Sequence, residues 1–305
     1  MGLDSKTYVS VYSLSISVSQ YEPILSSELA ATGSLHITLK LCIPPAGVSA
    51  EELFGPHVTG SGANCHHNNG TLPTQYCQTG VVSRLLGAKK VLLPEHVGIT
   101  FFKNSYYSLE YHYANPEQVW RKAGLRIYYS DKPREFTAHR IVISTNPLKQ
   151  AIMLPPNQSK FTLVSFFPRQ CVAQGFTIFN VLLHAHGAGR KLKLRHFRNG
   201  VELPTILFDE NYSNEYQQNR HLTQERQVLP GDELMMECEM ATGPDPVFYE
   251  MCVSHMYSYV PRGTPKYIYA TSWVDVDEQM KLVGIQSYNV YVSQGKGQGP
   301  RSYSS

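Results

Sequence analysis

The sequence lacks several features that would place a chain in a common functional class. It has no apolar run long enough to cross a bilayer, so we expect no transmembrane helix. It has little excess of one charge: 27 basic and 24 acidic residues leave a net charge of +3, which argues against a nucleic-acid-binding surface. A Walker-type loop, a dinucleotide fingerprint, a Cys-x-x-Cys zinc pair and a Gly-x-Ser-x-Gly nucleophile are missing. The sequence therefore gives no support to nucleotide, zinc or serine-hydrolase chemistry.

Convincing amphipathic helical patterns are also missing, whereas strand patterns are frequent. In residues 35–41, apolar and polar side chains alternate, as in a strand that is buried on one face. Residues 108–113 and 125–129 have similar patterns, and the 20 tyrosines favour strands. Glycine, proline and asparagine separate these short segments. The sequence therefore predicts an all-β sandwich architecture.

The length of 305 residues predicts two domains with a sizeable core. A boundary is expected near the Leu-Pro-Pro-Asn segment at residues 154–157. Residues 42–77 are expected to form a long loop pinned by cysteines. Residues 293–305 are rich in Gly, Ser and Gln, which predicts a disordered tail.

Several features favour an oxidising compartment. Six cysteines suggest disulfides, with fifteen possible pairings if all are joined. Three Asn-x-Ser/Thr patterns predict glycosylation at Asn69, Asn157 and Asn211. The first residues lack the basic-then-apolar pattern of a signal peptide, so the signal is expected to be omitted or the start incomplete. We expect a secreted protein, outside the cell or in the lumen of a secretory vesicle.

His184 and His186 form the most informative pair in the sequence. Residues i and i+2 of a strand point to the same face, so the two imidazoles are expected to lie side by side. Met251 follows further along the chain, and imidazole with thioether suits copper better than zinc or calcium. The alternative is that Met251 fills the core, as most methionines do.

The surrounding segments resemble one protein family. Residues 182–190 resemble the His-x-His segment of the copper type II, ascorbate-dependent monooxygenases, and residues 250–253 resemble the family's Glu-Met-Cys segment. The resemblance runs from about Tyr8 to Pro261 and is nearer to the dopamine-type branch than to the peptidylglycine branch. Other segments agree in the same order along the chain: 20–24, 109–116, 125–129, 209–216 and 229–232.

The resemblance implies two jelly-roll-like antiparallel β-sandwich domains that face each other across a cleft, with one copper on each side. Residues 1–154 would form the N-terminal domain with the electron-transfer copper. Residues 155–290 would form the C-terminal domain with the oxygen-binding copper, followed by a disordered tail at residues 291–305.

The resemblance also implies the copper ligands. His184, His186 and Met251 match the oxygen-binding site completely. His36 and His112 match two ligands of the electron-transfer site, but Leu35 stands where the family has the first histidine of an adjacent pair. Leu35 also fits the apolar face of its predicted strand, so this segment makes sense without a metal.

Cys65-His66-His67 offers adjacent histidines as a substitute. These residues lie in the predicted loop, and they align with a region that binds no copper in the family. Adjacent residues of a strand point to opposite faces, so a metal site here would need a loop conformation. Exposed loop histidines are the simpler interpretation.

The resemblance implies the disulfides Cys42–Cys77 and Cys238–Cys252. Cys65 and Cys171 are left without their family partners. These two thiols are either buried as ordinary small side chains or available for self-association by cross-linking to another chain.

Two functions remain open from the sequence. In the first, the protein hydroxylates an activated C–H bond of a small-molecule substrate with oxygen, using copper and electrons from ascorbate. In the second, it is a noncatalytic extracellular binding or structural protein that keeps the scaffold. The second is favoured by the missing histidine at position 35, by the two cysteines without family partners and by the three glycosylation patterns. It is also favoured by the loss of polar groups around the family's oxygen site, since Thr177, Leu182 and Ala185 replace them. The segment between Cys238 and Cys252 is shorter than in the dopamine-type enzymes, so their substrate pocket does not carry over.

Overall fold

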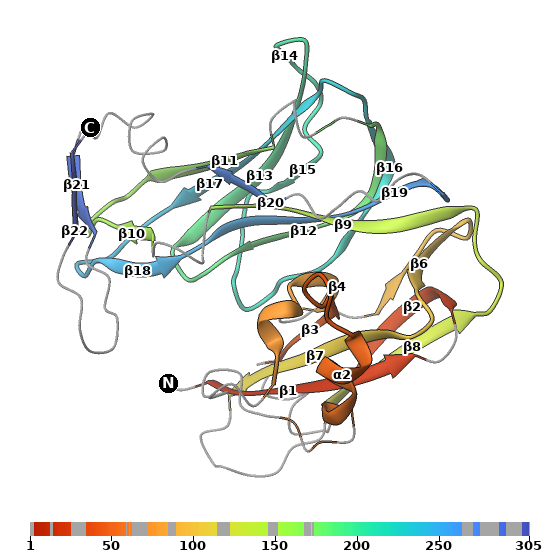
Figure 1. The fold of residues 1–305 in the computed structure, drawn as a ribbon. Coiled ribbons are helices and arrows are strands. Elements are labelled where there is room, and N and C mark those ends of the chain that lie inside the picture. Colours follow the sequence, from red (N-terminus) through yellow and green to blue (C-terminus); the bar gives the residue numbers. More distant parts are fainter. Residues whose placement is uncertain are drawn as a thin grey trace. The chain divides into compact units, whose positions relative to one another are not determined.

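The computed structural model describes residues 3–12, 15–25, 35–58, 60, 62, 72–84, 90–114, 123–145, 152–167, 172, 174–263, 271–274, 287–290 and 301–304. Strands make up nearly all of the regular structure in these ranges, beside the short helix α2 (Ala50–Phe54) (Figure 1). The all-β architecture expected from the sequence is confirmed. No helix in these ranges is long and apolar enough to cross a membrane.

The chain divides into two compact units that interleave along the sequence. Unit 1 is formed by Met1–Arg140, Glu215–Arg220 and Tyr257–Tyr269, and unit 2 by Ile141–Asn214, His221–Met256 and Ala270–Ser305. The expected division at residue 154, and the cleft between two domains, stay predictions.

Unit 1 contains two groups of paired strands. In the first group the order is β1-β7-β3-β4, and neighbouring strands are antiparallel. In the second group β2 pairs antiparallel with β5, β6 and β8, and β6 pairs in parallel with β9. The strands are β1 (Leu3–Tyr12), β2 (Ile16–Leu25), β3 (Leu35–Cys42), β4 (Thr79–Arg84), β5 (Val91–Leu92), β6 (Val97–Phe101), β7 (Ser105–Ala114), β8 (Ala123–Ser130) and β9 (Phe136–Thr145).

Strand β3 shows how the alternating pattern is used. Ile37 and Leu39 are buried, whereas Thr38 and Lys40 between and after them are only partly buried. One face of β3 therefore packs into the core and the other carries polar side chains. The three strands predicted from alternation are confirmed as β3, β7 and β8.

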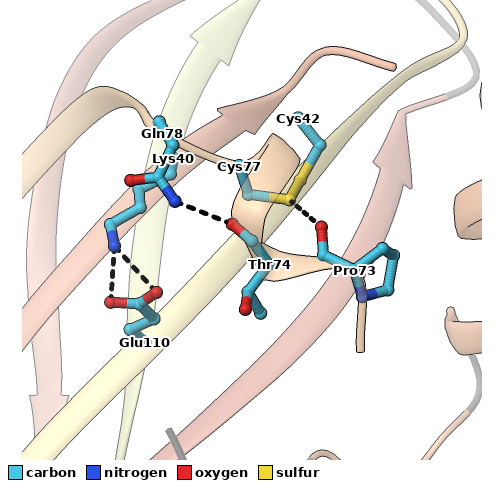
Figure 2. The surroundings of a disulfide bond; sticks show 7 residues. All are labelled: Lys40, Cys42, Pro73, Thr74, Cys77, Gln78 and Glu110. Atoms are coloured by element: carbon cyan, nitrogen blue, oxygen red, sulfur yellow. Dashed lines mark hydrogen bonds and ion pairs between the residues drawn. A yellow bond between two sulfur atoms is a disulfide. The ribbon is translucent and has the colours of Figure 1, made fainter. Parts of the chain in front are cut away.

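The disulfide Cys42–Cys77 joins the end of β3 to the 3₁₀ turn η2 (Thr74–Tyr76), and it confirms the pairing expected from the resemblance (Figure 2). Both cysteines are buried in a small cluster with Phe54 and Tyr106, whose rings lie 5.5 Å apart between centroids. Phe54 is the last residue of α2, which is followed by the 3₁₀ turn η1 (Gly55–His57). The predicted long loop is thus fixed to β3 and β7 by a disulfide and an aromatic contact.

Unit 2 contains a sheet in the order β11-β17-β13-β14, with β15 also paired to β13. Strand β12 lies between β16 and β19, β10 pairs with β18, and β20 runs parallel to residues 142–145 of β9. The strands are β10 (Ile152–Leu154), β11 (Phe161–Phe167), β12 (Phe176–Ala185), β13 (Gly189–Arg198), β14 (Val201–Glu202), β15 (Leu207–Asp209), β16 (Arg220–Val228), β17 (Glu233–Met240), β18 (Val247–Glu250), β19 (Cys252–Pro261), β20 (Thr271–Val274), β21 (Ser287–Val290) and β22 (Arg301–Ser304).

Strand β22 falls within the tail that was expected to be disordered, and it pairs antiparallel with β21. The rest of that tail, residues 291–300 and 305, lies outside the described residues.

A buried carboxylate, Asp232, ties β13 to the turn before β17. It lies 2.8 Å from His196 Nε2, and the guanidinium of Arg198 donates to both of its oxygens at 2.8 Å. The backbone N–H of Leu229 also donates to it at 2.8 Å. Burial alone would raise the pKa of Asp232, but the hydrogen bonds from Arg198, Leu229 and His196 outweigh it and hold that pKa well below its usual range. The carboxylate is therefore charged and fully paired in the folded protein.

We expect Asp232→Asn to lower the free energy of unfolding by about 2 kcal/mol, because it leaves buried donors without a charged acceptor. The folded pKa lies below the unfolded value of about 4, so the charged carboxylate stabilises the fold above that pH and loses this contribution as the pH falls. Urea unfolding followed by circular dichroism should show the largest difference between wild type and variant near neutrality, and a shrinking difference below about pH 4.

The matched control is Asp245→Asn, which changes an exposed carboxylate in the loop before β18. We expect a change below about 0.5 kcal/mol there. An equal effect of both substitutions would refute the role assigned to the Asp232 cluster.

Candidate metal centre

The two histidines of the His-x-His segment lie at the end of β12 and are brought together as the alternation requires. His184 is buried, with 7% of its surface exposed, whereas 45% of the His186 side chain is exposed. Their ring centroids are 5.3 Å apart and the rings are nearly perpendicular, at 82°. Two imidazoles that bind one ion at a metal–nitrogen distance of about 2.0 Å need centroids roughly 5 Å apart. The centroid spacing therefore matches that of two rings that share a metal ion, and the role of these histidines as ligands stays a prediction.

Tyr212 fixes the residue between these histidines. Its buried hydroxyl accepts a hydrogen bond from the backbone N–H of Ala185 at 2.9 Å and donates to the carbonyl of the same residue at 2.5 Å. Gly189 makes room for this contact, since a Cβ there would lie 2.8 Å from the Ala185 Cβ and 3.0 Å from the Tyr212 ring. Burial raises the pKa of the Tyr212 hydroxyl, so it remains a protonated donor. Tyr212 thus fixes the two peptide groups that flank Ala185, and with them the backbone direction of the His-x-His segment.

Glu250 connects the histidine segment to the methionine. Its side chain is fully buried, and its Oε1 accepts hydrogen bonds from the backbone N–H groups of His186 at 2.5 Å and Met251 at 2.8 Å. Its Oε2 accepts from the backbone N–H of Ala188 at 3.0 Å. One carboxylate oxygen therefore holds the backbones of two predicted copper ligands within a few ångströms of each other, although they are far apart in the sequence.

The position of Met251 is fixed further by the residue that follows it. Cys252 begins β19 and forms a disulfide with Cys238 of β17, with Cα atoms 5.9 Å apart. This pairing confirms the second disulfide implied by the resemblance. Met251 is partly exposed, between the buried Glu250 carboxylate and this disulfide. Its role as a ligand stays a prediction.

His36 and His112, the other predicted ligand pair, lie directly opposite each other on the antiparallel strands β3 and β7. Directly opposite residues share a face, with Cβ atoms about 5 Å apart, so the register brings these two histidines together. Both are partly exposed. The side chain of Leu35, which replaces the third histidine, lies outside the described residues, and its backbone is in register with Tyr113.

An ion pair occupies the same region of β3 and β7. Lys40 Nζ donates to both oxygens of Glu110 at 2.8 Å, as Figure 2 shows. Glu110 Oε2 also lies 3.7 Å from His112 Nε2. Burial opposes ionisation of Glu110, but His112 and Lys40 outweigh it and hold the pKa of this carboxyl below its usual value. The carboxylate next to the His36–His112 pair is thus already neutralised by a lysine.

Other predicted site residues have different outcomes. Leu182 is fully buried in β12, so the position has become part of the core. Asn157 and Asn211 are exposed in turns, where an attached glycan would reach solvent, and their modification stays a prediction. The remaining calls lie outside the described residues: Asn69, Cys65, His66, His67 and Cys171.

No three His, Cys, Asp or Glu side chains within the described ranges form a group placed to hold a metal ion. Methionine is not one of these four residue types, so this result does not bear on a site made of two histidines and a methionine. The sequence did not single out Glu250 or Tyr212 as positioning groups. A buried carboxylate that binds only backbone N–H groups leaves no periodic signal, because its partners are defined by the fold.

Comparison of the sequence with known proteins identifies one family. Residues 140–279 match the model for the copper type II ascorbate-dependent monooxygenase, C-terminal domain, and residues 14–120 match the N-terminal domain. The chain is 34% identical to MOXD1 homolog 1 of Drosophila melanogaster, covering 73% of this chain and 33% of the relative. It is 30% identical to DBH-like monooxygenase protein 1 of Homo sapiens (76% and 41%) and 30% identical to dopamine beta-hydroxylase of Homo sapiens (79% and 40%).

The chain spans well under half the length of these curated relatives. Among solved structures, the infectious bursal disease virus VP2 subviral particle is similar at 10% identity with a TM-score of 0.26, over 89% of this chain and 77% of that chain, a score too low to carry an argument. Both domain models match in their family order, so the chain belongs to the copper type II, ascorbate-dependent monooxygenases, in the DBH-like branch.

Proposed function

We propose that this chain binds one copper ion through His184, His186 and Met251 and acts as an ascorbate-dependent monooxygenase that hydroxylates an activated C–H bond. The observation that carries the proposal is the shared carboxylate: Glu250 Oε1 accepts from the backbones of both His186 and Met251. It is supported by the 5.3 Å separation of the two histidine rings. Two nitrogen donors and one thioether suit copper and leave positions open for a further ligand.

When bound, copper supplies the one-electron redox chemistry with dioxygen that amino-acid side chains cannot perform. The residues of the chain supply position and shielding. The buried His184 ring keeps one side of the centre free of water, whereas the half-exposed His186 leaves the other side open to a substrate. Tyr212 and Glu250 hold the backbone of the histidine segment and would keep its two rings in place around a bound ion.

A secretory location is part of the proposal. The two disulfides Cys42–Cys77 and Cys238–Cys252 belong to an oxidising compartment. Glycosylation at Asn157 and Asn211 fits their exposure. The proposed substrate is a small molecule. Its identity cannot be taken from the names of the relatives, because the chain spans less than half of each relative.

A second candidate function is a noncatalytic protein that keeps the scaffold and a single copper. One observation favours it: His36 and His112 lack the third family histidine, and the neighbouring Glu110 is paired with Lys40. Without a second copper, both electrons that each hydroxylation consumes would have to reach the centre in unit 2 directly from ascorbate. The copper content and the effect of restoring the histidine separate the two functions.

We expect about one copper equivalent per chain after reconstitution and dialysis, because only one predicted ligand set is complete. His184→Ala and Met251→Ala should each remove it, as measured by atomic absorption and by the Cu(II) electron paramagnetic resonance signal. His221→Ala, which changes an exposed histidine of β16, is the matched control and should retain the metal. A wild-type protein that binds no copper under these conditions would refute the proposal.

We expect Leu35→His to bind about one further copper equivalent, because it restores a third imidazole beside the facing pair His36 and His112. The added equivalent should disappear when His36→Ala is combined with it. Leu35→Gln tests whether polarity alone has an effect. Ascorbate-dependent oxygen uptake with a panel of phenethylamines should rise in Leu35→His if the scaffold is otherwise catalytically competent. A second copper without any gain in uptake would favour the noncatalytic function.

A further inference from the structure

Glu250 differs in its partners from three other carboxylates that are buried or partly buried. Asp232 is paired with Arg198, Glu110 with Lys40, and Glu239 with Lys160. Glu250 is fully buried, and among the described residues neither a lysine nor an arginine forms an ion pair with it. A buried negative charge without a cation is costly, and backbone N–H groups compensate for it only in part. Among the described residues, the Glu250 carboxylate therefore has no lysine or arginine as a counter-ion.

The group next to this charge is a predicted copper ligand. His186 Nδ1 lies 3.8 Å from Glu250 Oε1, which is beyond hydrogen-bonding distance. The carboxylate therefore does not orient the ring by a direct hydrogen bond, as carboxylates beside metal-bound histidines often do. It acts on the ligand set through the backbone of His186 and through its charge.

We infer that Glu250 is a positioning residue whose uncompensated charge also sets the redox balance of the copper centre, an inference that rests on the proposed copper site. A buried negative charge stabilises the doubly charged Cu(II) more than the singly charged Cu(I). His184, His186 and Met251 are neutral ligands, and the methionine favours the softer Cu(I). Glu250 offsets that preference, so that both oxidation states are held by one ligand set.

Position and charge can be separated by substitution. Glu250→Gln is nearly isosteric and keeps one oxygen acceptor for the N–H groups of His186 and Met251. It removes the charge and replaces the acceptor of the Ala188 N–H by an amide NH2 group. Glu250→Asp keeps the charge and shortens the side chain. If Glu250 only positions the backbone, Glu250→Asp should reduce copper affinity more than Glu250→Gln. If its charge matters, Glu250→Gln should change the ratio of Cu(II) to Cu(I) affinity more than Glu250→Asp.

The test measures Cu(II) and Cu(I) affinities separately, by competition with chelators specific for each oxidation state, and the midpoint potential by spectroelectrochemical titration. We expect Glu250→Gln to lose about tenfold more affinity for Cu(II) than for Cu(I), which raises the potential by about 59 mV for a one-electron couple. Glu250→Asp should keep the wild-type ratio of the two affinities. Asp232→Asn, which removes a buried carboxylate outside this centre, should lower stability without changing the ratio.

A second variant tests the charge effect without disturbing the core. Gly187 is exposed between the two hydrogen-bonded residues of the loop, and a Cβ built there meets no atom within 4 Å. Gly187→Lys should raise the potential and Gly187→Glu should lower it, with Gly187→Gln as the neutral control. These shifts should shrink at high salt, because an exposed charge is screened.

The outcomes distinguish this inference from the proposed function. A wild-type chain that binds no copper overturns the copper site itself. A wild-type chain that binds one copper, together with a Glu250→Gln variant that loses both affinities equally and Gly187 variants without opposite shifts, overturns the inference alone. Opposite shifts in Gly187→Lys and Gly187→Glu support it even if Glu250→Gln fails to fold.

Discussion

The candidate centre depends on one buried carboxylate. Glu250 accepts three backbone hydrogen bonds, and through them it joins the loop after β12 to the residue that precedes β19. Without this connection, no hydrogen bond to a shared group would join the backbones of His186 and Met251, which lie just after β12 and just before β19. The disulfide Cys238–Cys252 and the Tyr212 hydroxyl then restrict the same two segments from outside. Rigid ligand segments matter for a copper site, because the two oxidation states prefer different geometries and a soft site would adapt to one of them.

The sequence predicted the fold class because alternation is a local property. In β3, Ile37 and Leu39 face the hydrophobic core whereas Lys40 does not, and this follows from the order of residues alone. The proximity of His184 and His186 follows from the same periodicity. The two disulfides were expected from the family resemblance, since the cysteines alone allow fifteen pairings if all six are joined.

Other parts of the site could not be predicted from local patterns. The facing positions of His36 and His112 depend on the register of β3 against β7, which involves residues far apart in the sequence. The contacts of Tyr212 with Ala185 depend on the space left by Gly189, which has meaning only once the turn between β12 and β13 has formed. Glu250 carried no signal beyond its place before Met251, because its partners are backbone groups that every residue except proline has.

The two predicted copper sites differ in electrostatics as well as in ligand number. Beside His36 and His112, the carboxylate of Glu110 is already neutralised by Lys40, so this carboxylate does not offer an unpaired negative charge to a cation. Beside His186, the Glu250 carboxylate has no such partner among the described residues, so a bound cation relieves a buried charge. A third histidine at position 35 would therefore add a ligand to the first site but no charge. The ratio of Cu(I) affinity to Cu(II) affinity is therefore expected to be higher at the first site, even with Leu35→His, than at the second site. Restoring the ligand count by Leu35→His would therefore not by itself give the first predicted site the neighbouring negative charge that the second has in Glu250.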